Sequence, residues 1–248
     1  MIYLKMERSF IYYSMNEFFL PVVRWTIGPV EEAGFDCLKR SIQSFTKLYQ
    51  VQPIICHNGL TAEQLDYVSR IGVRIYAQNH SGHTVIPIGV AWKLYPIRLA
   101  SSRHEIFIDN DLIIEKKIPE IDKFLASKQL TLLLEGETRN YGRFDRHVPP
   151  GFNINSGIFG VPPKYHPFYL DDHQWEENCD STSRTWDEQG FVASSLLQSS
   201  HVIIPKTTIR NCEHDWKETS GSHFVGLNRV RRHFPYIEYK TNRMPFYL

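Results

Sequence analysis

The sequence predicts an α/β fold in which a mainly parallel central sheet is flanked by helices. Short apolar segments rich in Val and Ile alternate along the chain with segments whose apolar residues recur at helical spacing. Turn residues such as Gly, Pro and Asn separate these segments. The chain has 248 residues, of which 42% are hydrophobic, enough to bury one sizeable core. Alternation of this kind is typical of βαβ units, so we expect a single domain.

The first predicted elements are a strand, a helix and a second strand. Residues 22–27 form an apolar run that ends at Gly28-Pro29, which predicts a strand. Residues 35–49 predict an amphipathic helix, and residues 52–56 predict the next strand. The helical spacing is carried by Phe35, Leu38, Ile42, Phe45 and Tyr49.

Two further helical segments and two strands follow. Thr61 is a candidate N-cap with Gln64 three residues later, the pattern of a capping box, and this predicts a helix that ends before Gly72. Residues 74–77 predict the third strand. A helix-like stretch over residues 90–100 then leads to the apolar strand 105–108.

Two aspartates follow that strand, in the sequence Asp109-Asn110-Asp111. Open α/β sheets bind ligands at the carboxyl ends of their strands, and paired carboxylates suit a hard cation such as Mg²⁺ or Mn²⁺. The alternative to a metal site is a polar turn, because Asp and Asn favour turns after strands. Taken alone, the motif favours the turn, so the metal site depends on other residues.

Composition excludes several classes of protein. Lys and Arg number 28 and Asp and Glu 27, a net charge of +1, so we expect no nucleic-acid partner. The four cysteines are scattered, which argues against a disulfide framework and favours the cytoplasm. No uninterrupted apolar stretch reaches membrane-spanning length.

We divide the chain into three parts: an N-terminal extension over residues 1–20, a domain over 21–230 and a tail over 231–248. The tail mixes cationic and aromatic residues, a composition that suits peripheral contact with an anionic membrane or a lipid-linked acceptor. The alternative is a terminal segment that packs its aromatic rings on the domain.

The order of several short motifs resembles that of GT-A glycosyltransferases, whose fold is a single Rossmann-like domain, and most of all the glycogenin-like retaining enzymes. The block 95–99 followed by 106–111 resembles the Tyr-x-Arg-Leu and Asp-x-Asp motifs of that family. By this resemblance Arg98 would face the donor nucleotide-sugar, and Asp109 and Asp111 would bind the metal. If Arg98 has no functional role, it would be an ordinary solvated arginine on a helix.

A second motif, over residues 152–162, resembles the family segment that passes beside the donor sugar. Asn155 and Gly157 are the matching positions, and a glycine there permits a close backbone approach. The alternative, without a functional role, is that Gly157 forms a bulge in a strand.

A third motif, over residues 186–191, resembles the start of a family helix whose acidic and amide side chains reach the sugar or the acceptor. Acidic residues also favour helix N-termini through the helix dipole alone. The matching residues, which we take as candidate catalytic groups, are Asp187, Glu188 and Gln189.

The fourth motif, over residues 223–229, resembles the family's C-terminal His-Phe-x-Gly-x-x-Lys. The resemblance implies that His223 completes the metal site and that Gly226 lets the backbone approach the diphosphate. Arg229 stands where the family has Lys, and arginine can also neutralise a pyrophosphate. The Pro-Trp that usually follows the lysine is replaced by Val230-Arg231.

Together these motifs imply a glycosyltransferase that requires Mn²⁺ or Mg²⁺ and moves a sugar from a nucleoside-diphosphate sugar, usually a UDP-sugar in this family. The acceptor would be a hydroxyl of a glycan, a lipid-linked sugar or a protein. Retention of anomeric configuration is favoured. The alternatives are an inverting enzyme with Asp187 or Glu188 as general base, and a non-catalytic module that binds nucleotide-sugars or glycans.

Overall fold

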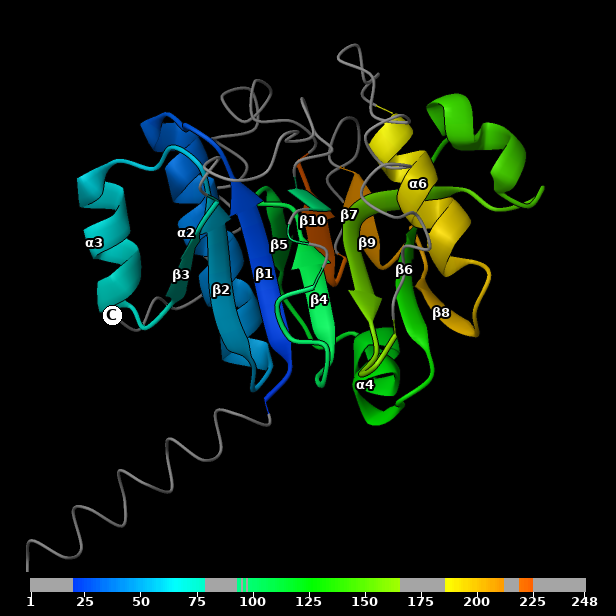
Figure 1. The fold of residues 1–248 in the computed structure, drawn as a ribbon, viewed down its shortest axis with the longest axis horizontal. Coiled ribbons are helices and arrows are strands. Elements are labelled where there is room, and N and C mark those ends of the chain that lie inside the picture. The colour runs from blue at the N-terminus through cyan, green and yellow to red at the C-terminus, as the bar shows by residue number, and fades with distance from the viewer. Residues whose placement is uncertain are drawn as a thin grey trace, which may run out of the picture.

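The computed structural model describes residues 20–78, 93, 94, 96, 98–165, 186–211 and 219–224, and its centre is a seven-stranded sheet (Figure 1). The strand order is β3-β2-β1-β4-β7-β6-β8, so β4 lies in the middle. Four of the six pairings are parallel, and β7 runs antiparallel to both of its neighbours. The strands are β1 (Val22–Ile27), β2 (Gln52–His57), β3 (Arg74–Ala77), β4 (Glu105–Ile108), β6 (Thr131–Glu135), β7 (Ile154–Val161) and β8 (His201–Ile204). The predicted α/β fold with a mainly parallel sheet is confirmed.

Helices cover both faces of the sheet. The helices are α2 (Glu32–Leu48), α3 (Ala62–Arg70), α4 (Pro119–Ala126), α6 (Asp187–Leu196) and the 3-10 helix η2 (Gly142–His147). Side chains alternate along a strand, so Trp25 of β1 packs with α2, whereas Phe107 and Phe159 pack with α6 and η2. The two hydrophobic clusters therefore lie on opposite faces of one sheet, in three layers.

The local patterns place β1, α2, β2, α3, β3 and β4 where they are observed. The capping box of α3 is present: Gln64 N donates to Thr61 Oγ1 over 3.2 Å, and Thr61 N donates to Gln64 Oε1 over 3.0 Å. Hydrophobic periodicity and turn residues were sufficient signals for these elements.

The helix predicted over residues 90–100 is wrong in its described part. Lys93 and Leu94 lie in a short 3-10 segment, and residues 98–100 are irregular. Pro96 gives the physical reason, because proline disfavours helical backbone at the residue before it and cannot donate a helix hydrogen bond. Residues 90–92, 95 and 97 lie outside the described residues.

A second, three-stranded sheet was not predicted. It consists of β5 (Leu112–Ile114), β10 (Gly221–His223) and β9 (Ile209–Asn211), with β10 antiparallel to β5 and parallel to β9. Two serines of α2 hold β5: Ser41 Oγ donates to Leu112 O over 2.5 Å, and Ile114 N donates to Ser44 Oγ over 3.1 Å. This small sheet brings residues from the end of the described chain to the centre of the molecule.

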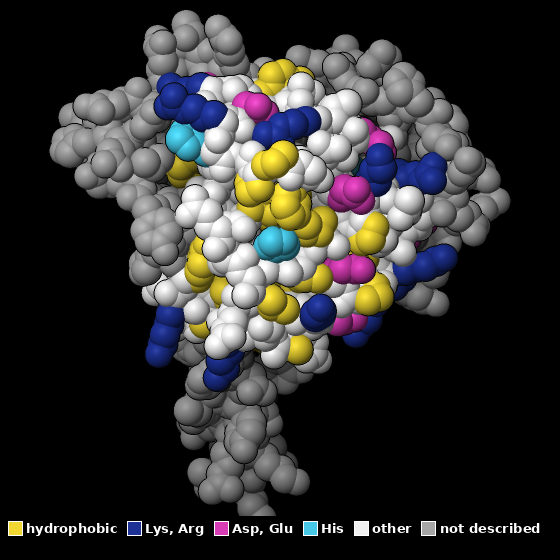
Figure 2. Space-filling view, turned by 90° about the vertical axis from the view of Figure 1, so that its right-hand side faces the viewer, with side chains coloured by type: hydrophobic (Ala, Val, Ile, Leu, Met, Phe, Trp, Pro, Cys, Tyr) yellow, Lys and Arg dark blue, Asp and Glu magenta, His cyan; other side chains and the backbone are white. Residues whose placement is uncertain are grey.

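The edge of the main sheet at β8 carries apolar side chains in its middle, with charged side chains around them (Figure 2). Apolar surface of this kind is ordinary for a folded protein. Among the described residues, no helix combines the length and apolar character needed to cross a bilayer. Apart from Leu20, the predicted N-terminal extension lies outside the described residues, as does the predicted tail over 231–248.

Candidate metal site

Three side chains with metal-binding atoms converge at the carboxyl end of β4. Asp109, Asp111 and His223 each offer one ligand atom, and these atoms lie within 4.8 Å of one another. His223 Nε2 is 3.5 Å from Asp109 Oδ2 and 3.3 Å from Asp111 Oδ1. Asp111 and His223 are each 4% exposed. No other such cluster occurs within the described ranges. The structure brings together the three residues predicted to bind a metal.

Backbone pairing explains how residues 112 positions apart in the chain meet at this site. His223 pairs with Leu112 in the β5–β10 ladder, so its side chain lies beside the aspartates that precede β5. Phe224 N donates to Asp111 O over 3.0 Å, and Asp109 N donates to Gly157 O over 2.8 Å. The site is therefore fixed by hydrogen bonds from β10 and β7.

Gly157 leaves the room that His223 occupies. A Cβ at this position would lie 2.8 Å from His223 Nδ1 and closer still to Cε1. Gly157 N also donates to Asn155 Oδ1 over 2.7 Å, which orients the amide of Asn155. The predicted pair Asn155 and Gly157 thus lies against the third candidate ligand.

The chemistry of the cluster fits a hard divalent cation. Carboxylate oxygens suit Mg²⁺ and Mn²⁺, and imidazole nitrogen is also a ligand for first-row metals such as Mn²⁺. Asp109 uses one oxygen toward Lys93, at 3.0 Å from Nζ, and turns the other toward His223. Two carboxylates and one imidazole leave further coordination positions for oxygens of a substrate.

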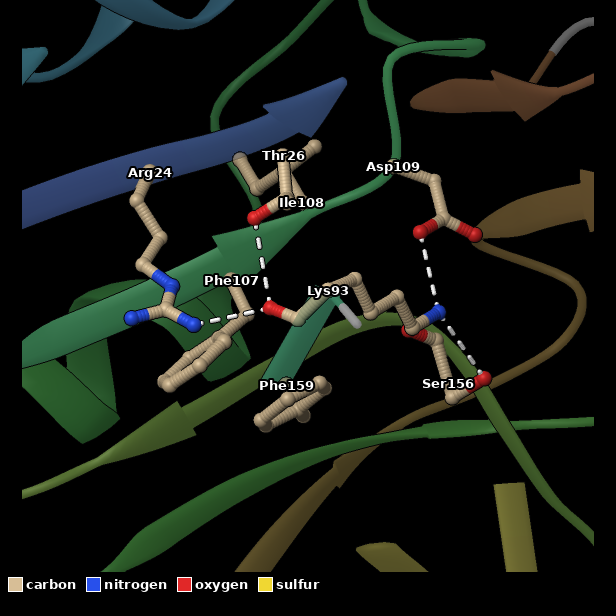
Figure 3. A pocket seen from close by; sticks show the side chains of 8 residues that line it. All are labelled: Arg24, Thr26, Lys93, Phe107, Ile108, Asp109, Ser156 and Phe159. Carbon is tan, nitrogen blue, oxygen red and sulfur yellow. Dashed lines mark hydrogen bonds and ion pairs between the residues drawn. The ribbon is translucent and has the colours of Figure 1, made fainter. Parts of the chain in front are cut away.

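Lys93 contacts Asp109 and Ser156 (Figure 3), and its ion pair with Glu188 connects the candidate metal site to helix α6. Its Nζ lies 3.0 Å from Asp109 Oδ1 and 2.9 Å from Glu188 Oε1, and it donates to Ser156 Oγ over 3.2 Å. Ser156 Oγ donates in turn to Glu188 Oε2 over 3.1 Å. Lys93, Asp109 and Ser156 line one small pocket together with Arg24 and Phe107.

These buried charges shift one another's pKa values. Burial opposes the charged form of Asp109, but Lys93 and His223 outweigh it and hold the pKa of Asp109 well below its usual value. Burial also opposes the charge of Lys93, yet Asp109 and Glu188 raise the pKa of Lys93. Burial raises the pKa of Glu188 to about 7, with Lys93 acting against this shift and Asp109 adding to it. We infer an ammonium at Lys93 and a carboxylate at Asp109.

Helix α6 begins with the three predicted residues, and all three are buried. Only Glu188 reaches the Lys93 cluster. Arg143 holds Asp187, because Arg143 N donates to Asp187 Oδ1 over 2.9 Å and Arg143 Nε lies 3.1 Å from Oδ2. Gln189 Nε2 donates to Asn140 O over 2.9 Å. In this structure Asp187 and Gln189 join α6 to the segment around η2.

Arg98 does not reach the cluster. Its Nε lies 3.1 Å from Glu105 Oε2, and Glu105 starts β4 whereas Asp109 follows its end, a separation of about 13 Å along the strand. Its other four N–H groups are directed to the backbone carbonyls of Pro162, Tyr165, Ala100 and Arg103. All five donors of the guanidinium are used. Contact between Arg98 and a nucleotide stays a prediction, and it requires some of these bonds to exchange. Gly226 and Arg229 lie outside the described residues.

Metal affinity is expected to depend steeply on pH. Burial lowers the pKa of His223, but Asp111 and Asp109 outweigh burial and raise it to about 9. His223 must lose its proton before it binds a metal, so the Mn²⁺ dissociation constant should fall about tenfold per pH unit from about pH 6.5 to about pH 8.5. Electron paramagnetic resonance of free Mn²⁺ measures this. The variant His223→Asn should show weaker binding with a shallower dependence, and a flat profile in the unmodified protein would contradict the assignment.

Lys93 and Ser156 are the functional candidates that sequence reasoning missed. Lys93 lies in the stretch predicted as a helix, and nothing in its local pattern distinguishes it from a solvated lysine. Ser156 stands between Asn155 and Gly157, and its position in that motif was the available signal.

No protein-family model and no curated protein matches the sequence. Solved structures do match, at low sequence identity. A galactosyltransferase, LgtC, in complex with donor and acceptor sugar analogues has a TM-score of 0.58 and 10% identity, over 86% of this chain and 94% of that chain. GlyE, a glycosyltransferase of Streptococcus pneumoniae TIGR4, has a TM-score of 0.55 and 11% identity, over 85% of this chain and 55% of that chain. The bifunctional glycosyltransferase WbbM has a TM-score of 0.52 and 11% identity, over 84% of this chain and 46% of that chain.

These likenesses extend over most of this chain. Only about one residue in ten is identical, so these likenesses are evidence for the fold alone. The protein therefore has the GT-A fold, the fold of these glycosyltransferases.

Proposed function

We propose that this protein is a metal-dependent glycosyltransferase that takes its sugar from a nucleoside-diphosphate sugar, most simply a UDP-sugar, and transfers it to a hydroxyl acceptor. The observation that carries the proposal is the cluster of Asp109, Asp111 and His223 at the end of the central strand of a GT-A fold. Ligands bind at this edge of open α/β sheets. The acceptor would be a glycan, a lipid-linked sugar or a protein.

The chain's own residues have distinct roles in this proposal. Asp109, Asp111 and His223 hold Mn²⁺ or Mg²⁺, which when bound neutralises charge on the leaving diphosphate. Gly226 and Arg229 are proposed to contact the diphosphate. Asn155 and Gly157 are proposed to border the donor sugar, and Glu188 is proposed to supply negative charge near a sugar centre that becomes positive.

Retention of configuration is the favoured outcome. A general base must reach the acceptor hydroxyl, but Asp187 is held by Arg143, and Glu188 is held by Lys93 and Ser156. In the retaining route the leaving phosphate accepts the acceptor's proton, so neither carboxylate has to act as base. One observation supports the inverting alternative: the pKa of Glu188, about 7, suits a base at neutral pH. The anomeric configuration of the product, read by NMR, separates the two routes.

The experiment that tests the proposal is incubation with Mn²⁺ and a panel of nucleotide-sugars, with release of nucleoside diphosphate as the readout. We expect slow release from at least one donor, its loss with EDTA and its recovery when Mn²⁺ is restored. A donor that binds in a metal-dependent way without release would make the protein a binding module. Absence of both binding and release across the panel would reject the proposal.

A further inference from the structure

Arg24 is a buried charge in the middle of β1 that the candidate metal site does not itself use. Its side chain is 1% exposed, and its guanidinium lies 4.0 Å from the centre of the Phe107 ring. Phe107 stacks on Phe159 at 4.3 Å. A buried charge in such apolar surroundings is costly unless it is well paired. An apolar side chain could fill this volume, so packing alone does not require an arginine here. The role of the charge is therefore indicated by the hydrogen bonds that Arg24 makes.

Those bonds converge on the segment that carries Lys93. Arg24 Nη2 donates to Lys93 O over 2.7 Å, and Nη1 donates to Pro96 O and, over 3.2 Å, to Glu105 Oε1. Thr26, two residues later on the same face of β1, donates from Oγ1 to Lys93 O over 3.2 Å. One backbone carbonyl therefore receives hydrogen bonds from two side chains of the same strand (Figure 3).

The two ends of Lys93 are thus held by different parts of the protein. Its backbone carbonyl is held by β1, and its ammonium contacts Asp109, Glu188 and Ser156. A lysine side chain has four rotatable bonds, so confining it costs rotamer entropy. A backbone fixed at the correct place removes other conformations of Lys93, so Nζ meets both carboxylates in a larger fraction of those that remain.

We propose that Arg24 is a positioning residue that acts through Lys93: it fixes the backbone of residues 93 and 96 so that the Lys93 ammonium bridges Asp109 of the candidate metal site and Glu188 of α6. The consequence for catalysis rests on the proposed glycosyl transfer, whereas the placement of Lys93 does not. Glu105, which Arg24 shares with Arg98, balances part of the buried charge.

The test is the rate at which a small amine-acylating reagent modifies Lys93 in the folded protein, measured by peptide mass spectrometry. In Arg24→Met, Lys93 should separate from its partners more often, and its modification should speed up at least about fivefold. Arg24→Lys, which restores a cation at this position, should recover part of the protection. Arg103→Met is the matched control, because Arg103 is a partly buried arginine whose described side-chain hydrogen bonds go to Leu20 O and Gln52 Oε1.

Unchanged protection of Lys93 in folded Arg24→Met would overturn the proposal, as would an equal loss of protection in Arg103→Met at a similar melting temperature. If Arg24→Met does not fold, Thr26→Val removes the second donor to Lys93 O and should raise the modification rate in the same direction. In that case, protection of Lys93 as complete as in the unmodified protein, in both Thr26→Val and Arg24→Lys, would also reject the role.

Turnover gives a second readout that a merely structural role would not move. If Arg24 acts through Lys93, then Arg24→Met should lower kcat in the unmodified background and have little further effect once Lys93→Met is present. Additive losses in this double-mutant cycle would contradict the proposal. Because modification of Lys93 requires no turnover, the positioning role is decided even if the protein transfers no sugar.

Discussion

Replacement of Asp111 with Asn should reduce Mn²⁺-dependent release of nucleoside diphosphate by at least about a hundredfold, the order of loss when one group that stabilises a developing charge is removed. Asp111 is 4% exposed, and its carboxylate lies 3.3 Å from His223 Nε2. Asn has nearly the same shape, so the fold should persist, but it is neutral and a poorer ligand for a hard cation. Release rates and circular dichroism of the same preparations measure both effects.

Asp66→Asn is the matched control for this substitution. Asp66 lies on α3, is 64% exposed at its side chain and pairs only with Arg70 over 2.8 Å among the described contacts. An exposed pair of this kind contributes little, so turnover should be unchanged. Metal-dependent turnover that survives Asp111→Asn would remove Asp111 from the site.

Substitution of Gly157 by Ala should weaken Mn²⁺ binding by about ten- to a hundredfold, the range for changes that displace a ligand through its neighbours. The new Cβ would lie 2.8 Å from both His223 Nδ1 and Asn155 Oδ1. Neither contact is tolerable, so the imidazole must shift from the place that it occupies beside the two aspartates. Titration of Mn²⁺ by electron paramagnetic resonance gives the affinity.

Gly160→Ala controls for crowding on the same strand. A Cβ there would lie 2.8 Å from the Phe124 ring, on the side of the strand remote from His223. This variant should lose stability through overpacking, by about 1–3 kcal/mol, yet keep its metal affinity when folded. Equal Mn²⁺ affinity in Gly157→Ala and the unmodified protein would show that His223 does not depend on this glycine for its place.

Much of the fold could be predicted because its signals are local. The capping box at Thr61 and the alternation of strands with amphipathic segments need only neighbouring residues to act. The aspartates could be placed at a strand end for the same reason. The proximity of these aspartates to His223 depends instead on the β5–β10 ladder, which joins residues over a hundred positions apart. Only the resemblance to a family predicted that His223 would lie beside them.

The parts that the sequence did not reveal are those governed by tertiary contacts. Lys93 became part of the site because Arg24 and Thr26 hold its carbonyl, and no periodicity encodes those bonds. Arg98 matched its motif, yet Glu105 and four carbonyls take its donors at the opposite end of β4. Short motifs identify residue types, whereas the partners available after folding decide which of them reach the site.

The most direct test of the central claim is a crystal structure with Mn²⁺ and a nucleoside diphosphate, with the metal located by its anomalous scattering. We predict one Mn²⁺ ion bound by carboxylate oxygens of Asp109 and Asp111 and by His223 Nε2, at about 2.0–2.3 Å, with diphosphate oxygens completing its coordination. A nucleoside diphosphate bound with its metal elsewhere, or with His223 outside the coordination sphere, would contradict the account.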